Sequence, residues 1–344
     1  MRASLAATTL TMVLGAASVA RSDVNPARGA IAIPGGEPGV GYDDLQAAPG
    51  LHVILVPAGR TGRLALIDPA TRKVTSVAGF SAAATYPGGH GQGTTSAVEL
   101  DGKRGLVVAT DRGSGALKIV DVRAGAIVAS VALAGGPDYV RTVAAAREVW
   151  VTEPARKRIE VLRADDSGAR LSPAGEVIVP DGPESLVVDE RAGRAFTQSW
   201  KTDTYAVDLR VRRVVATWKN GCRRARGLAL DSTRGLLFVG CGEGRVTVLS
   251  VATGRVLSTA STGPDVDSIG YAASLGHLYV PSAGTGVLEI FGVASDGRLT
   301  RLGDVPTAMG AHTVAFDPPT RTLFVGTPDH GAVVVARDVF RSSL

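Results

Sequence analysis

Apolar and polar segments alternate along this chain in one order, which recurs about seven times between Gly41 and Phe340. In the clearest copy, apolar segments at 226–231, 236–241 and 246–250 are separated by short polar or glycine-rich segments, and a fourth begins at Val256. Short apolar runs bounded by turn residues are typical of β-strands. A repeat of roughly 40 to 50 residues with four short strands predicts one blade of a β-propeller.

The register of the repeat gives the number of blades. Equivalent positions in the second strand of successive copies lie 41 to 52 residues apart. These positions are Val56, Val108, Val151, Thr197, Val239, Val280 and Val325. We therefore predict an all-β fold, a seven-bladed β-propeller. Because the last copy ends early, at 332–336, we expect the apolar segment at 29–34 to pair with it, which would close the ring and cover an open sheet edge.

The first twenty residues have the pattern of a secretory signal peptide. A short basic start is followed by an apolar run at 5–17 and by Ser18-Val19-Ala20, a small-residue cleavage site. The run is too short for a membrane span, and no second candidate span follows it. We expect residues 21–344 to form a single propeller domain that is exported, to the periplasm or as a secreted protein, and is monomeric.

Charge changes this picture little. The formal net charge is +5, the chain has no run of five like charges, and aromatic residues make up 5% of it. This composition is a weak indication of nucleic-acid binding, which is expected from clustered basic residues and stacking aromatics. Arg223, Arg224 and Arg226 lie close together, so nucleic acid stays open as a second alternative partner, although we do not expect it.

The two cysteines both fall in the fifth copy. Cys222 precedes its first strand and Cys241 ends its second strand, so antiparallel pairing places both on one face. In an oxidising compartment this arrangement predicts a Cys222–Cys241 disulfide. A metal-binding thiolate pair is the alternative, but the sequence lacks the Cys-x-x-Cys or Cys/His companions that such sites use.

Two further features allow more than one interpretation. The segment 81–94 is rich in glycine and too long for a hairpin turn, so it is either a solvated loop or a flap over the channel mouth. Trp150, Trp200 and Trp218 lie on or beside second and outer strands, and we expect all three to pack between blades.

Several segments resemble the YncE-like, YVTN-repeat family of bacterial seven-bladed propellers. They are Pro34-Gly-Gly followed by Asp43, the paired-cysteine copy at 222–241, Val246–Val256, Leu278-Tyr-Val280 and 310–317. The resemblance covers about residues 29 to 340 and implies the fold; it implies no single function, because propellers host many activities. Relatives tend to carry an acidic pair and a proline after the first cysteine, whereas this chain has Cys222-Arg-Arg-Ala-Arg226. A cation-binding role is therefore not expected at this blade.

Polar residues mark one end of the predicted channel. The first strand of each blade lines the propeller axis, so the residues at its start face a shared funnel. These residues are Asp43, Thr95, Asp138, Glu184, Arg226, Asp267 and His312. One interpretation is a wet channel with acidic turn caps. The other is a polar ligand site made of convergent carboxylates, a histidine and an arginine, and we take these seven as candidate ligand-binding residues.

These observations favour a noncatalytic binding protein that holds a small polar ligand or a protein partner at the channel mouth, without a cofactor or a resident metal. A metal-dependent, lactonase-like hydrolase is the alternative, because carboxylates with a histidine can hold a divalent cation that activates water. Arg224 and Arg226 would oppose a cation, and no Gly-x-Ser-x-Gly segment indicates a nucleophilic serine.

Overall fold

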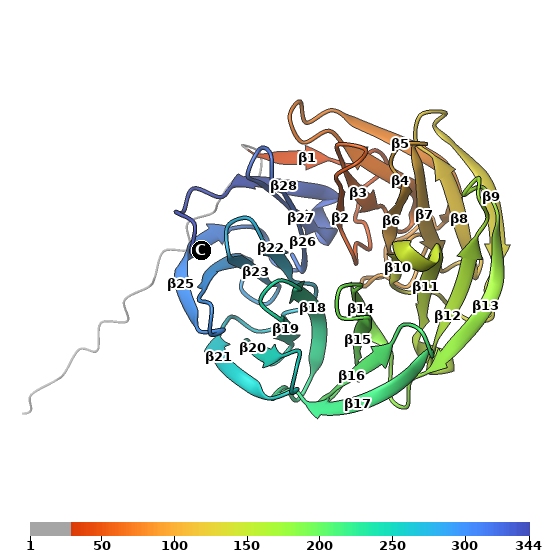
Figure 1. Ribbon diagram of the computed structural model, residues 1–344. Coiled ribbons are helices and arrows are strands. Elements are labelled where there is room, and N and C mark those ends of the chain that lie inside the picture. Colours follow the sequence, from red (N-terminus) through yellow and green to blue (C-terminus); the bar gives the residue numbers. More distant parts are fainter. Residues whose placement is uncertain (1–28) are drawn as a thin grey trace, which may run out of the picture.

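Seven antiparallel sheets of four strands each surround a central axis in the computed structural model, which describes residues 29–344 (Figure 1). The described part of the chain contains no α-helix and only three short 3-10 turns: η2 (Ala144–Ala146), η3 (Pro154–Arg156) and η4 (Pro328–His330). The prediction of an all-β, seven-bladed propeller is confirmed. The predicted signal peptide, residues 1–20, lies outside the described residues.

Blades one to four follow one another along the chain, and each runs from its inner to its outer strand. Blade one holds β2 (Gln46–Ala48), β3 (Val53–Pro57), β4 (Thr61–Ile67) and β5 (Val74–Ala82), and blade two holds β6 (Ala97–Asp101), β7 (Leu106–Asp111), β8 (Ala116–Asp121) and β9 (Ala126–Ala132). Blade three holds β10 (Val140–Val143), β11 (Glu148–Glu153), β12 (Arg158–Ala164) and β13 (Leu171–Ile178), and blade four holds β14 (Glu184–Asp189), β15 (Arg194–Gln198), β16 (Asp203–Asp208) and β17 (Arg213–Lys219).

The last three blades complete the ring. Blade five holds β18 (Ala225–Asp231), β19 (Leu236–Cys241), β20 (Arg245–Ser250) and β21 (Val256–Ser261), and blade six holds β22 (Gly270–Ala272), β23 (His277–Ser282), β24 (Val287–Val293) and β25 (Leu299–Pro306). Blade seven holds β26 (Thr313–Asp317), β27 (Thr322–Thr327), β28 (Ala332–Arg337) and, as its outer strand, β1 (Ala30–Ala32). All seven positions that define the sequence register lie on second strands, from β3 to β27.

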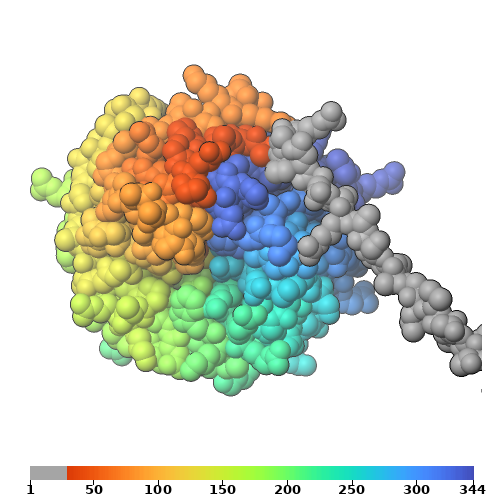
Figure 2. Space-filling view, turned by 180° about the vertical axis from the view of Figure 1, so that it is seen from behind, coloured from red at the N-terminus to blue at the C-terminus, as the bar shows by residue number. Residues whose placement is uncertain are grey.

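The N-terminal strand closes the propeller as predicted. β1 pairs antiparallel with β28, and Ala30 lies opposite Val334. The red start and the blue end of the described chain are therefore neighbours on the surface (Figure 2). Without β1, the backbone N–H and C=O groups along the outer edge of β28 would lose their hydrogen-bond partners. An open strand edge of this kind can pair with another molecule and promote aggregation.

The hydrophobic core is divided into seven clusters, each of which lies between two neighbouring blades. Leu55 of blade one packs with Val107 of blade two, for example, and Phe196 of blade four packs with Val239 of blade five. Because each sheet is covered on both faces, its second strand is buried along nearly its whole length rather than at alternate residues, and the VILVP segment of β3 is apolar throughout. The interior strands therefore hold the inner strands rigidly around the channel.

Candidate functional site

The seven candidate residues all lie at the start of an inner strand, at the same end of the channel. Asp43, Thr95, Asp138, Asp267 and His312 come just before β2, β6, β10, β22 and β26, while Glu184 opens β14 and Arg226 is the second residue of β18. The electrostatic coupling among them shows that the charged members converge. The pKa of Glu184 is raised well above its usual range by burial and then by Asp138, Asp267 and Asp43, and Arg226 partly offsets this rise. Their role in ligand binding stays a prediction.

A cluster of two carboxyl groups and one imidazole lies at the centre of this ring. Asp43 and Asp138 each offer a carboxylate oxygen, and His90 offers an imidazole nitrogen. These three atoms all lie within 4.8 Å of one another. His90 Nδ1 lies 3.0 Å from Asp43 Oδ2. Both aspartates are buried, whereas His90 is partly exposed.

The three groups of this cluster have pKa values that are shifted in different directions. Burial would raise the pKa of Asp43, but the charges of His90 and Arg112 outweigh it and hold that pKa well below its usual range. Burial and the nearby Asp43 carboxylate raise the pKa of Asp138. The Asp43 carboxylate raises the pKa of His90 to about 9, against the opposing effect of burial. These opposite shifts arise because the Asp43 carboxylate lies close to both the Asp138 carboxyl group and the His90 imidazole.

His90 is a site residue that the ring pattern missed. It lies on the segment between β5 and β6, here called the mouth loop (residues 83–93), which sequence reasoning left open between a solvated loop and a flap. The loop packs against the segment that precedes blade one: a Cβ on Gly41 would lie 2.5 Å from the Gly89 carbonyl oxygen, and a Cβ on Gly39 would lie 2.2 Å from the Tyr86 ring. This close backbone approach brings the His90 side chain over the ring and supports the flap interpretation.

Arg112 is the second residue that sequence reasoning missed, and it ties the loop to the ring. It directly follows β7, its Nη2 forms an ion pair with Asp138 Oδ1, and its Nε donates to the Pro137 carbonyl oxygen at 3.0 Å. Its backbone N–H donates to the carbonyl oxygen of Gly93 at 2.7 Å. Nothing in the repeat marks this arginine, because its role depends on the path of the mouth loop.

Glu184 and Arg226, like Asp43, each keep a buried polar atom without a hydrogen-bond partner, namely Glu184 Oε2 and Arg226 Nη1. Both residues sit at irregularities of their inner strands. The register of β14 against β15 shifts between Glu184 and Val187, and that of β18 against β19 shifts between Ala225 and Leu228. Such bulges re-aim side chains and are common next to functional sites.

The two bulges brace one another across the blade boundary. The Ser185 hydroxyl donates to the Arg226 carbonyl oxygen at 3.0 Å, and Gln198 Nε2 donates to the same oxygen at 2.7 Å. Ser185 has a left-handed backbone, with φ of 55°, which is uncommon for a residue other than glycine. A strained inner strand that is fixed by its neighbour is the kind of backbone found where a side chain must point in a set direction.

The expectation that Trp200 packs between blades is wrong. Trp150 is fully buried and Trp218 packs against Phe196, with 5.6 Å between ring centroids, but Trp200 is 40% exposed. The guanidinium carbon of Arg226 lies 4.4 Å from the centroid of the Trp200 ring, in a cation–π arrangement. Trp200 therefore supports the Arg226 side chain at the edge of the mouth.

Thr95 and His312 are bound to the scaffold. The Thr95 hydroxyl donates to the Asp138 carbonyl oxygen at 2.9 Å. His312 places Nδ1 2.7 Å from the Gly310 carbonyl oxygen and Nε2 3.0 Å from the Tyr42 carbonyl oxygen, and its ring centroid lies 6.3 Å from that of His90. Thr95 thus positions Asp138, and His312 joins blade seven to the segment before blade one.

A hollow of about 400 Å³ opens above the ring. Its lining includes His90, Arg224, Arg226, Asp265, Asp267 and His312. A volume of this size suits a small molecule or one large side chain of a partner. Lining that carries both signs of charge suits a ligand with both signs.

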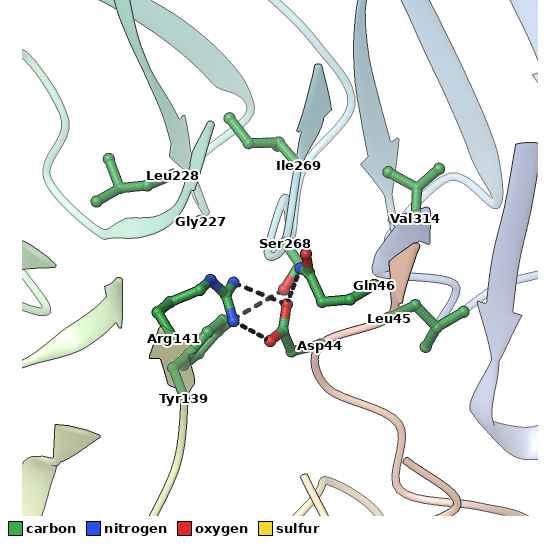
Figure 3. Close-up of a pocket in the computed structure, with 10 residues that line it drawn as sticks. All are labelled: Asp44, Leu45, Gln46, Tyr139, Arg141, Gly227, Leu228, Ser268, Ile269 and Val314. Atoms are coloured by element: carbon green, nitrogen blue, oxygen red, sulfur yellow. Dashed lines mark hydrogen bonds and ion pairs between the residues drawn. The ribbon is translucent and has the colours of Figure 1, made fainter. Parts of the chain in front are cut away.

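Next to the ring, the inner strands carry a largely buried ion pair. Arg141 Nη1 donates to Asp44 Oδ2 at 2.6 Å, Arg141 Nη2 donates to Asp44 Oδ1 at 3.1 Å, and Gln46 also donates to this carboxylate (Figure 3). Between this pair and the ring, the Tyr139 hydroxyl lies 2.8 Å from Ser268 Oγ. The charges of Asp44 and Arg141 are therefore already paired with each other.

The cysteines lie beside the mouth. Cys222 and Cys241 are at disulfide distance, with 5.3 Å between their Cα atoms. Two of the three nearby arginines have side-chain partners, because Arg226 lies over Trp200 and Arg224 pairs with Asp265. The Glu243 carboxylate accepts from the backbone N–H groups of Arg223 and Arg224. In residues 29–344, no helix has the length and apolar character needed to cross a membrane.

Comparisons with known proteins support the fold and leave the function open. No family model and no curated protein matches the chain. A chain of the Kuenenia stuttgartiensis hydrazine synthase structure superposes with a TM-score of 0.71 at 14% identity, covering 88% of this chain and 96% of its own. A chain from a crystal structure of the mitotic checkpoint complex gives a TM-score of 0.74 at 16% identity, covering 98% of this chain and 100% of its own. At these identities the likeness establishes the seven-bladed propeller fold, which is commonly an interaction scaffold; membership of the YncE-like family is not established.

Proposed function

We propose that this chain is an exported binding protein that holds a small zwitterionic ligand in the mouth of its propeller. The observation that carries the proposal is the pair of buried, unpartnered atoms of opposite character, Glu184 Oε2 and Arg226 Nη1. Buried polar groups nearly always have a partner, so two of them at one bulged rim indicate a partner from outside the chain.

The charges of the mouth suggest how the ligand lies. Asp43, Asp138, Glu184 and Asp267 crowd one another, as the raised pKa of Glu184 shows, so a cationic group among them would relieve their repulsion. Arg224 and Arg226 line the hollow, whereas Glu184 lies outside its lining. An ammonium group near Glu184 and a carboxylate near Arg226 would satisfy both ends of one molecule.

A protein partner and a nucleic acid are weaker candidates for the same surface. The hollow could take one charged side chain of a partner, but a lining that carries charges of both signs suits a zwitterion better. Asp265, which pairs with Arg224, and Glu243, which accepts from the backbone N–H of Arg223, place negative charge beside the arginines and weaken the field for phosphates. Export is supported by the signal-like residues 1–20 and by the cysteine pair at disulfide distance. The repeat and the cysteine-bearing blade favour kinship with YncE-like propellers.

The proposal is tested by calorimetric titration of the purified protein with the common α-amino acids, and with ethylamine and acetate as the two separate halves of a zwitterion. We expect at least one amino acid to bind far more tightly than either half. Glu184→Gln and Arg226→Gln should each weaken that binding by at least about tenfold, because each removes a charged hydrogen bond.

Matched controls are Arg223→Gln, which changes the exposed arginine of the same segment, and Glu176→Gln on β13. Both should leave the affinity unchanged. Equal affinities for the amino acid and for its amine half would refute the zwitterion, and tight binding that survives both mouth substitutions would refute the site.

A further inference from the structure

The Asp43–His90–Asp138 cluster has a feature that hydrogen bonding does not explain. His90 Nδ1 and Asp43 Oδ2 lie 3.0 Å apart, yet neither atom has a hydrogen-bond partner. The Asp43 side chain is only 2% exposed. Two polar atoms therefore face each other at close range, buried, without the alignment of a hydrogen bond.

This separation is the one expected between two ligands of the same metal ion. With ligand distances of about 2.1 Å, adjacent ligands at right angles lie about 3.0 Å apart, and adjacent ligands of a tetrahedral ion about 3.4 Å apart. The third donor, a carboxylate oxygen of Asp138, lies within 4.8 Å of each of the other two atoms. Small side-chain adjustments therefore suffice to place all three around one ion.

The surroundings hold the donors in place. Arg112 engages Asp138 Oδ1 and leaves the other oxygen of that carboxylate for an ion, and the Tyr139 hydroxyl lies 3.3 Å from Asp43 Oδ1. Groups that orient the ligands in this way are typical of metal sites. Arg112 places a positive charge nearby, but Asp267 contributes negative charge at His90.

We propose that Asp43, His90 and Asp138 form a site for a borderline divalent cation, of which Zn²⁺ is the reference case. One imidazole nitrogen with two carboxylate oxygens suits Zn²⁺ or Mn²⁺ better than Ca²⁺, which takes six to eight oxygen ligands. Because His90 also lines the hollow, the remaining coordination positions face the ligand space. Such an open site can hold water or a ligand oxygen, which is the arrangement of catalytic rather than structural zinc.

The test uses the purified full chain, stripped with EDTA and dialysed, and titrates it with Zn²⁺, Mn²⁺ and Ca²⁺ separately. We expect one Zn²⁺ per chain and weaker binding of Ca²⁺. Substitution with Co²⁺ should give visible absorption bands that are lost in His90→Ala. No amino-acid ligand is needed, so failure here leaves the proposed ligand binding intact.

His90→Ala and Asp138→Asn should each weaken Zn²⁺ binding by at least about tenfold, because the loss of even an orienting group costs that much. His330→Ala, which removes an exposed histidine of η4, should have no effect. Circular dichroism establishes that each variant is folded. Absence of stoichiometric Zn²⁺ binding, or unchanged binding in folded His90→Ala, would overturn the metal site.

Discussion

The disulfide beside the mouth gives a prediction whose size follows from the fold. Cys222 and Cys241 are separated by 19 residues along the chain, and the bond would tie the approach to β18 to the end of β19. Replacement of both cysteines by serine would remove the cross-link and raise the conformational entropy of this loop in the unfolded chain. For a loop of this length the chain-entropy treatment gives about 3 kcal/mol at 25 °C.

That free energy converts to a shift in melting temperature. Unfolding entropy near 60 °C is about 2.1 cal/mol/K per residue, which for residues 29–344 is about 0.7 kcal/mol/K. The Cys222→Ser/Cys241→Ser variant should therefore melt about 4 °C below the parent protein. Differential scanning calorimetry, run with and without dithiothreitol, measures this difference.

The reductant provides the internal control. It should lower the melting temperature of the parent protein to that of the double variant and should leave the variant unchanged. Two freely alkylated thiols in protein purified from an oxidising compartment would show that the bond does not form. An oxidised protein whose melting temperature is insensitive to reductant would refute the loop-entropy reasoning.

Three further predictions concern the scaffold and the mouth loop. Deletion of residues 21–35 removes β1, so it should lower the melting temperature and promote aggregation, measured by light scattering; unchanged solubility and stability would contradict closure by β1. Burial opposes ionisation of Asp338, but hydrogen bonds from His277 and Tyr279 prevail and lower the pKa of Asp338 below 3.8. The ionised Asp338 therefore stabilises the fold above that pH, and this stabilisation is lost as the pH falls through the folded-state pKa. Asp338→Asn should therefore cost about 2 kcal/mol in denaturant unfolding at pH 7 and less below pH 4, and a cost that does not depend on pH would contradict this assignment. Gly41→Ala should displace the mouth loop, because its Cβ would meet Gly89, and should speed proteolysis within 83–93 without changing the far blades; a cleavage rate equal to that of the parent would contradict the loop packing.

The fold and the ring could be predicted because every blade of a propeller repeats the same order of strands and turns. Each repeat places one residue at the start of its inner strand, so Asp43 and Glu184 could be assigned to the same end of the channel although they are far apart in sequence. The pairing of 29–34 with the last blade followed from the early end of that repeat in the same way. These expectations rest on period and register, which the sequence carries directly.

The rest depends on features that have no fixed place in the repeat. His90 reaches the ring only because the mouth loop packs against Gly39 and Gly41, and no periodicity gives the path of such a loop. The bulges at Glu184 and Arg226 arise from one extra residue on an inner strand, which leaves no clear signal in composition. Trp200 was misplaced because an aromatic residue beside a strand usually packs inward, whereas here it supports the Arg226 guanidinium.

The central claim, that the propeller mouth is a binding site for a zwitterion, is tested most directly by a crystal structure of the protein grown with the amino acid that binds most tightly in the calorimetric panel. The account predicts density in the hollow, with the ammonium nitrogen within hydrogen-bond distance of Glu184 Oε2 and the carboxylate against Arg226 Nη1. A ligand bound elsewhere on the molecule, or a mouth in which these two atoms stay without a partner while the ligand is bound, would contradict it.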